Sequence, residues 1–397
     1  MRVAVPLGAI LSVAMAYGVT LPVLPFLLER LLGQADAAGV SRHTGWLTGL
    51  YTLALFVMSP LWGALSDRVD RRGVMFFGLA GSAVALLALD NVSGLAEIYA
   101  ARLASGFLSA AVFPAALAYV AEHSPLAEHP RIFALAASAT TLGFLLGPAL
   151  GSWLSPMVVA PPADMRLASV LMADSPFFLV ALLNTIAAVA VSALPTMRSA
   201  RVAPRPTGGE AAIRRYLLLT AVVAFGISTA EVGVTLFGKH ELSLGPRGIS
   251  AFFLACSLVM VVAQSVGFPF VKRRLGDRPI QVSAFALMTV GLSAAALSDS
   301  SWAAGLAFVL VSAGTGILIP SLATQISEAT TDSQGQALGW QAAAANLGQA
   351  LAAASTGMLF AAAPAAPFLL GAALLAVGAL IAARQRNQST AGERHGA

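Results

Sequence analysis

Long apolar stretches recur along this chain from one end to the other, with short polar segments between them. Within a stretch the apolar residues do not alternate with polar ones, so the pattern predicts helices rather than strands. Most stretches approach or exceed the ~20 residues that a helix needs to cross a bilayer. We count twelve of them, at residues 4–27, 45–66, 73–89, 95–119, 132–154, 171–194, 216–238, 249–271, 279–298, 301–324, 337–360 and 366–383.

The composition agrees with a chain whose solvent is mostly lipid. Its 397 residues are 58% hydrophobic and only 10% charged, and the mean hydropathy is +0.81. A soluble domain carries ~25% charged residues, and a membrane barrel would show short segments of period two. The sequence therefore predicts an all-α membrane protein with twelve transmembrane helices.

The longest polar interruption lies at residues 195–215 and holds three prolines, two glycines and five arginines. It predicts a basic cytoplasmic linker between an N-terminal six-helix bundle at 1–194 and a C-terminal six-helix bundle with a short cytoplasmic tail at 216–397. Residues 113–122 and 319–328 each place a proline eight residues before a glutamate, at an offset of 206 residues. This echo favours a duplication, so we expect the two bundles to be pseudo-symmetric.

Basic residues predict the orientation in the membrane. Placing the N-terminus inside puts 17 of the 23 lysines and arginines in cytoplasmic segments. By the positive-inside rule, we expect a multi-pass protein of the inner (plasma) membrane with both termini in the cytoplasm. The first stretch leads straight into further spans and is expected to be a retained helix, not a cleaved signal peptide. The excess of basic residues behind the net charge of +5 thus sets the orientation in the membrane, and no nucleic-acid partner is expected.

Three segments combine small residues, prolines and charges. Residues 63–72 read GALSDRVDRR, in which Gly63 is expected to allow close helix approach and Asp67 to cap or pair at a helix end. Residues 143–152 read GFLLGPALGS, whose glycines four apart predict a groove for a neighbouring helix. Residues 18–25 read GVTLPVLP and predict a kink near the outer end of the first helix.

These segments resemble motifs of the major facilitator superfamily, in its twelve-span drug:proton antiporter branch. The first is similar to the family's signature loop, with Asp70 in place of its second glycine, and implies a conformational latch that includes an acid at the inner end of span four. The second resembles the antiporter motif of facilitator-type exporters and implies export coupled to inward proton flow. The latch would comprise Gly63, Asp67, Arg68, Arg71, Arg72 and Glu122, and the antiporter motif Gly143, Gly147, Pro148 and Gly151.

Within that branch the chain is most similar to the tetracycline exporters. Residues 21–25, the signature loop and residues 335–338 carry this likeness. Spans one and three lack the membrane acids of that group, so the resemblance does not imply tetracycline as the substrate.

Only two ionisable side chains lie well inside predicted spans, Arg102 in span four and Glu231 in span seven. Charges in a bilayer normally face a bundle interior or a wet cavity. The resemblance places both spans on a central cavity and, through the pattern Arg102-x-x-x-Gly106, implies proton transfer at Arg102. Two interpretations stay open. Either Arg102 and Glu231 couple protons to transport, with Glu231 as the proton carrier, or they form a static ion pair between the halves.

A substrate cavity would also need polar and aromatic groups at depth. Such groups have a simpler use, because intramembrane amides hydrogen-bond between helices and membrane aromatics often only pack. The candidates for the cavity are Tyr17, Phe113, Tyr119, Phe237, Gln341 and Asn346.

Together these features predict a proton-coupled efflux transporter (antiporter) of small amphipathic or cationic molecules, which works by alternating access as a monomer in the lipid bilayer. It would use the proton gradient and neither a cofactor nor a metal. The alternative is a facilitator-type transporter of a metabolite, such as an amino acid or a sugar, without proton antiport. An enzyme is not expected, because the five histidines map to loops or the tail: His43, His123, His129, His240 and His395.

Overall fold

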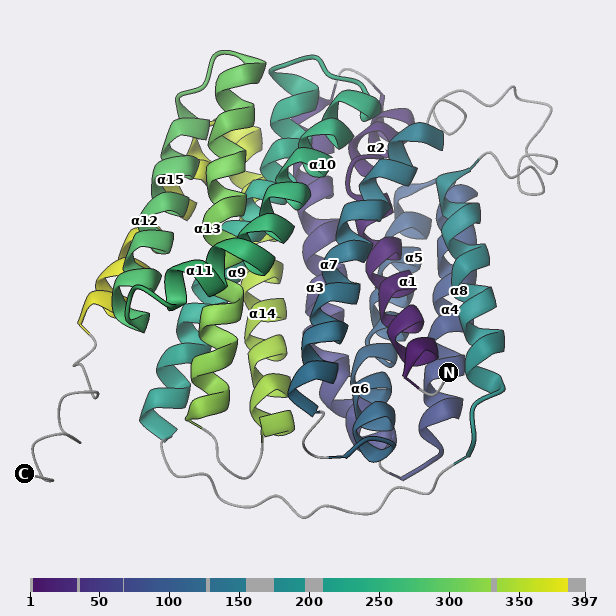
Figure 1. Cartoon of the computed structure of the whole chain (residues 1–397). Coiled ribbons are helices and arrows are strands. Elements are labelled where there is room, and N and C mark those ends of the chain that lie inside the picture. The colour runs from purple at the N-terminus through teal and green to yellow at the C-terminus, as the bar shows by residue number, and fades with distance from the viewer. Residues whose placement is uncertain are drawn as a thin grey trace, which may run out of the picture.

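The computed structural model describes residues 3–33, 36–66, 68–125, 129–154, 175–196, 210–329 and 334–384. The regular elements in these ranges are all helices, which stand side by side as long rods (Figure 1). Each predicted apolar stretch is found as one helix or as consecutive helices. The N-terminal half contains α1 (Ala4–Thr20), α2 (Leu24–Leu32), α3 (Ala37–Ser66), α4 (Arg71–Asp90), α5 (Leu95–Ser109), α6 (Val112–Glu122), α7 (His129–Leu154) and α8 (Pro176–Ser192).

The C-terminal half begins with the long helix α9 and contains one irregular rod, in which a short π-helical turn interrupts the span. Its elements are α9 (Glu210–His240), α10 (Pro246–Val262), η4 (Ala263–Gly267), α11 (Phe268–Lys272), α12 (Asp277–Ala296), α13 (Ser301–Glu328), α14 (Gln334–Ala362) and α15 (Ala366–Ala383).

The helices have the length and composition of membrane spans. Among the described residues, eight helical segments are long and apolar enough to cross a bilayer, and the bent pair α1 and α2 forms a ninth. The segment Leu135–Gly151 within α7 and the helix α8 are also apolar but shorter. The chain is therefore a multi-pass α-helical membrane protein.

The predicted kink in the first span is confirmed. Helix α1 ends at Thr20, α2 begins at Leu24 with Pro25 in its first turn, and the two axes differ by 44°. Proline lacks the backbone donor that a continuous helix would use, which favours the break. The echo between spans four and ten is less regular, because Pro114 lies just after the break between α5 and α6 whereas Pro320 lies inside the unbroken α13.

The two ends of the bundle are named here by the linker. At the linker end α8 finishes at Ser192 and α9 begins at Glu210; the opposite end is the far end (Figure 1). Residues 210–215, predicted to belong to the linker, form the first turns of α9. Residues 197–209 lie outside the described ranges.

The halves pack directly on each other through α3 with α14 and through α7 with α10. Glycine permits the first contact, because a Cβ on Gly45 would overlap the backbone of Ala353 and Gly357, and one on Gly357 would lie 2.5 Å from the carbonyl oxygen of Ser41. Both glycines lie toward the far end of their helices. The two halves are thus in backbone contact at that end.

Candidate functional site

Glu231 joins the two halves at the middle of the bundle. It lies on α9, and its Oε2 accepts a hydrogen bond of 3.2 Å from the hydroxyl of Tyr17 on α1. Two polar side chains on the same face of α9 are also engaged: Thr235 donates to the carbonyl of Glu231, and Ser228 donates to the carbonyl of Gln349 on α14. The polar face of α9 is therefore directed at helices of both halves.

Tyr17 is held in place by two other aromatic rings. Its ring centroid lies 5.1 Å from that of Tyr51 on α3, and Phe144 on α7 meets it edge-on at 5.4 Å. Aromatic pairs at such distances are favourable beyond the area they bury. The hydroxyl that reaches Glu231 thus comes from a ring clamped between α3 and α7.

Arg102 contacts the second ring of this aromatic pair, that of Tyr51. Its guanidinium carbon is 4.7 Å from the centroid of Tyr51, a cation–π distance. The residue is 0% exposed, and within the described part of the chain none of its guanidinium nitrogens has a hydrogen-bond partner. The hypothesis of a direct ion pair with Glu231 is therefore wrong, and the contacts that lead from Arg102 to Glu231 run through the rings of Tyr51 and Tyr17.

The two charges differ in access. Glu231 keeps part of its surface accessible although it lies at mid-span, whereas Arg102 is sealed. A partly exposed carboxylate at mid-span is what a proton or a cation would need to bind there.

A second polar link joins the halves at the far end. Nζ of Lys239, near the end of α9, donates to Oε2 of Glu29 on α2 at 2.5 Å and to the carbonyl of Pro25 at 3.0 Å. It also lies 4.6 Å from the ring centroid of Phe26. The sequence analysis missed this pair, because no spacing rule relates residues that are 210 positions apart.

At the linker end, the expected contact between the signature loop and span four is present. Arg71 donates from Nε and Nη2 to the two carboxylate oxygens of Glu122, at 2.9 and 2.8 Å. Arg72 donates to the carbonyls of Ser192 and Leu194 at the end of α8. These two arginines tie α4 to the ends of α6 and α8.

Two further residues of the loop show what their positions do. Asp70, which stands in place of the family's second glycine, is the N-cap of α4, and its side chain accepts from the backbone N–H of Arg72 at 3.2 Å. Gly63 does not serve a close approach, since a Cβ there would meet nothing within 4 Å. Arg68 is exposed, and Asp67 lies outside the described residues.

The predicted glycine groove on α7 is confirmed, and its occupant is α1. A Cβ on Gly147 would lie 2.8 Å from the carbonyl oxygen of Met15, and one on Gly151 would lie 2.9 Å from that of Val19. A Cβ on Gly143 would overlap Ala14, and Cδ of Pro148 would lie 2.9 Å from a Cβ on Gly18. The groove thus positions the helix that carries Tyr17.

The comparisons with known proteins agree with this architecture. The profile described as Major Facilitator Superfamily matches residues 7–330 and, in a second alignment, residues 216–395. The chain belongs to the Major Facilitator Superfamily.

Among facilitator sequences, the chain is 28% identical over 340 residues to the class D tetracycline resistance protein of Salmonella ordonez, which covers 82% of this chain and 81% of that protein. It is 25% identical over 263 residues to multidrug resistance protein 2 of Bacillus subtilis (strain 168), covering 66% and 64%. The expected likeness to the tetracycline exporters is confirmed.

Solved facilitator structures share the fold at low identity. A structure of the human organic anion transporter MFSD10 superposes with a TM-score of 0.71 at 20% identity and covers 96% of this chain and 98% of that one. A POT family transporter in complex with a thioalcohol-conjugated peptide gives 0.75 at 14% identity, with coverages of 96% and 94%. At identities this low, the comparison shows a shared fold and carries no statement about function.

The facilitator fold brings only one of the predicted cavity residues, Tyr17, to Glu231. Tyr119 is 0% exposed, stacks on His123 at 4.1 Å and donates to the carbonyl of Pro195, so it packs within the N-terminal half. Phe237 is buried against Phe368. Of the other candidates, Phe113 is exposed, and Gln341 and Asn346 are partly accessible.

Tyr51 is the functional residue that the sequence analysis missed. It lies mid-way along α3 and contacts both Arg102 and Tyr17. The hydroxyl of a tyrosine that is buried in an apolar span usually has a hydrogen-bond partner. The position of Tyr51 in the middle of such a span could therefore have identified it from the sequence.

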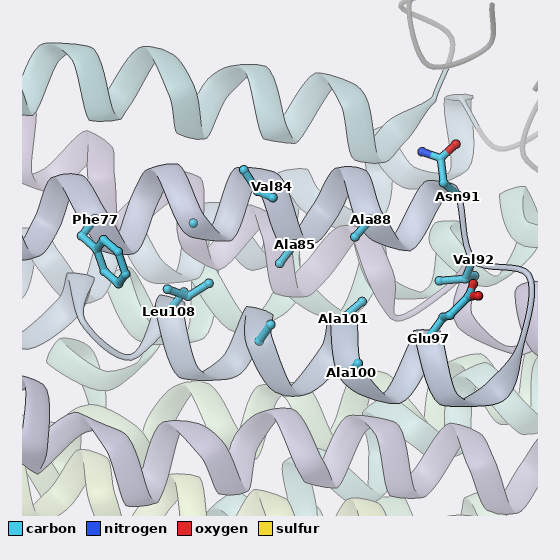
Figure 2. Close-up of a pocket in the computed structure, with 12 residues that line it drawn as sticks. Phe77, Val84, Ala85, Ala88, Asn91, Val92, Glu97, Ala100, Ala101 and Leu108 are labelled. Carbon is cyan, nitrogen blue, oxygen red and sulfur yellow. The ribbon is translucent and has the colours of Figure 1, made fainter. Parts of the chain in front are cut away.

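A separate groove of about 680 Å³ lies on the surface between α4 and α5 (Figure 2). Its lining is mostly apolar, with alanines facing Val84 and Leu108, and Asn91 and Glu97 stand at its far end. None of the predicted cavity residues lines it. Arg102 belongs to a different face of α5 from Ala101 and Leu108, so this groove is distinct from the polar centre.

Three histidines lie in helices, contrary to the expectation that all five are in loops or the tail. His43 is in α3, where it contacts the hydroxyl of Tyr99 at 2.8 Å, and α7 begins at His129 while α9 ends at His240. Over the residues that the structure describes, no group of three or more His, Cys, Asp or Glu residues could hold a metal ion.

Proposed function

We propose that this facilitator is a proton-coupled exporter, an antiporter that moves small amphipathic or cationic molecules by alternating access. Two pseudo-symmetric bundles of six spans each would rock about the mid-span centre. The observation that carries the proposal is the hydrogen bond between Tyr17 and Glu231, since it places a mid-span carboxylate of one half under the control of the other half. The names of the relatives, which are tetracycline and multidrug resistance proteins, support export of foreign compounds.

In this mechanism Glu231 is the proton carrier. While the far end is closed, the carboxylate accepts from Tyr17 and faces accessible space, where a cationic substrate binds it in place of a proton. When the halves part at the far end, the bond to Tyr17 breaks and the substrate leaves. Glu231 then takes a proton from that side and carries it back as the far end closes again.

We further propose that the linker end faces the cytoplasm and that the protein lies in the inner (plasma) membrane with both termini inside. Arginines 71, 72, 214 and 215 at the linker end support this orientation by the positive-inside rule. Reporter fusions after residues 70, 205 and 390 should report cytoplasm, and fusions near residues 36, 92 and 243 the opposite side. A reversed result at any two sites would contradict the twelve-span orientation.

The decisive experiment is proton-driven uptake into inverted vesicles by Glu231→Gln. Glutamine keeps the volume and accepts the Tyr17 hydrogen bond but cannot carry a proton. We expect loss of gradient-driven uptake with retention of counterflow, which needs no net proton movement. Glu97→Gln is the matched control, because Glu97 is an exposed acid at the start of α5. Full gradient-driven uptake by Glu231→Gln would favour the facilitator without antiport.

A further inference from the structure

Arg102 carries a positive charge that the protein does not neutralise. It is completely buried, and across the described residues its three guanidinium nitrogens find no hydrogen-bond partner. A guanidinium stays protonated in proteins, so it cannot escape this cost by losing a proton. A buried charge is retained at low cost only when an opposite charge and hydrogen bonds compensate it.

The groups around Arg102 contact its side chain but accept no hydrogen bond from its guanidinium. The Tyr51 ring supplies a cation–π contact of 4.7 Å but accepts none of the guanidinium N–H groups in the plane of the fork. Gly106, one turn along α5, lets the helix lie directly on α3, since a Cβ there would be 2.7 Å from the carbonyl oxygen of Tyr51. Ser109, on the same face as Arg102, is engaged with Ser82 at 3.2 Å.

The carboxylate in the same centre, that of Glu231, has a hydrogen-bond donor other than Arg102. Glu231 accepts from Tyr17, and the ring of Tyr17 contacts that of Tyr51, so the contacts between the anion and the cation run through two rings. The centre therefore holds one positive and one negative group that do not neutralise each other.

We infer that Arg102 binds a carboxylate of the transported molecule. The planar fork of a guanidinium matches a carboxylate with two parallel hydrogen bonds, and Tyr51 must swing aside to admit it because its ring covers the guanidinium. The inference rests on the proposed function and narrows its substrates to zwitterions, with the cationic group at Glu231 and the carboxylate at Arg102.

The test is equilibrium binding of matched acids and ethyl esters to the purified full chain in a neutral detergent. Three pairs are used: a zwitterionic fluoroquinolone, an aromatic amino acid and 4-(aminomethyl)benzoate, each with its ester. For at least one pair we expect the wild type to bind the acid tenfold or more tightly than the ester. Arg102→Gln should lose this preference, and Arg102→Lys, which keeps the charge but not the fork, should keep part of it.

Thermal unfolding without ligand separates ligand binding from a structural role. Arg102→Gln removes an unpaired buried charge, so its midpoint should rise or stay level, whereas a residue that stabilises the fold would give a lower midpoint. Equal binding of acid and ester by the wild type in all three pairs, an unchanged preference in Arg102→Gln, or a lowered midpoint would each overturn the inference. Failure of the proposed function would appear instead as a wild type whose uptake ignores the pH gradient, whatever its preference for acids.

Discussion

Tyr17 donates its hydroxyl to Glu231 across the boundary between the halves, at 3.2 Å, while its ring stays within the N-terminal half against Tyr51 and Phe144. Ring and hydroxyl therefore have separable roles. The ring stabilises one half, and the hydroxyl ties that half to the other in this structure, in which the far end is closed.

Tyr17→Phe should shift the protein toward the state that is open at the far end. The substitution keeps the ring contacts and removes one hydrogen bond to a charged acceptor, worth ~1.5–3 kcal/mol, which corresponds to a population shift of about tenfold or more. Spin labels at Arg42 and Ala363, exposed near the far ends of α3 and α14, would report it as a longer distance in a Cys256→Ala background.

Tyr99→Phe is the control for that experiment. It also removes a tyrosine hydroxyl hydrogen bond, to His43 at 2.8 Å, but both residues belong to the N-terminal half. Its distance distribution should match the wild type. A Tyr17→Phe distribution equal to that of Tyr99→Phe would mean that the hydroxyl does not hold the halves together.

The ion pair between Lys239 and Glu29 should contribute to the same closure. Lys239→Gln leaves Glu29 without its partner at 2.5 Å, and a partly exposed pair is worth ~1 kcal/mol or less. We expect a maleimide that cannot cross membranes to label Thr20→Cys a few times faster in Lys239→Gln, because Thr20 is buried in the closed state.

Charge reversal tests whether the pairing itself matters. Glu29→Lys combined with Lys239→Glu should bring the labelling rate back toward that of the parent, and each reversal alone should raise it. Asp277→Asn breaks a pair with Lys272 within the C-terminal half and should leave the rate unchanged. No recovery in the double variant would show that Lys239 acts through Pro25 or Phe26 rather than through Glu29.

The helices were predictable from the sequence because lipid imposes a single rule. Every span must satisfy its backbone internally and present apolar side chains, so the observed bounds of α15, Ala366–Ala383, coincide with the predicted stretch 366–383. Arg102 and Glu231 were predictable for the related reason that a charge in a span is costly and stands out.

What the sequence could not supply is how helices meet. Arg102 and Glu231 were expected to share a pathway or to pair, and only the contact of Tyr17 on α1 with Tyr51 on α3 shows that they are linked through two rings. The same limit explains Gly63, whose spacing resembles a motif but whose surroundings in this structure are open. Contacts within one helix follow from spacing, whereas contacts between helices depend on rotation and depth.

Gly45→Ala should prevent complete closure at the far end. The new methyl group would overlap the backbone of Ala353 and Gly357, and backbone cannot move aside as a side chain can. We expect faster amide hydrogen exchange in residues 40–49 and slower turnover. Gly73→Ala, where a Cβ meets nothing within 4 Å, is the control and should change neither. Wild-type exchange in Gly45→Ala would mean that the contact between α3 and α14 adjusts without cost.

Gly147→Ala should act differently, because its contact lies within one half. The methyl group would lie 2.8 Å from Met15 and Val19 backbone atoms on α1, and overpacking of this kind costs ~1–3 kcal/mol. We expect a lower midpoint of thermal unfolding with an unchanged distance between the labels at Arg42 and Ala363. A longer distance with unchanged thermal stability would instead place α7 among the elements that move between states.

Arg71→Lys distinguishes a conformational latch from a cluster that only sets topology. The positive-inside rule counts lysine and arginine alike, so a topogenic role predicts normal insertion and normal turnover. A latch needs the fork, because Arg71 bonds both carboxylate oxygens of Glu122, at 2.9 and 2.8 Å, and lysine cannot reproduce two parallel hydrogen bonds. We therefore expect Arg71→Lys to insert with the parent topology and to turn over at least several times more slowly.

Glu122→Gln should slow turnover to a similar extent, and combining the two should add little, since both remove the same contact. Arg68→Lys is the control, as Arg68 is exposed. Turnover of Arg71→Lys equal to that of Arg68→Lys would reduce the loop to an anchor.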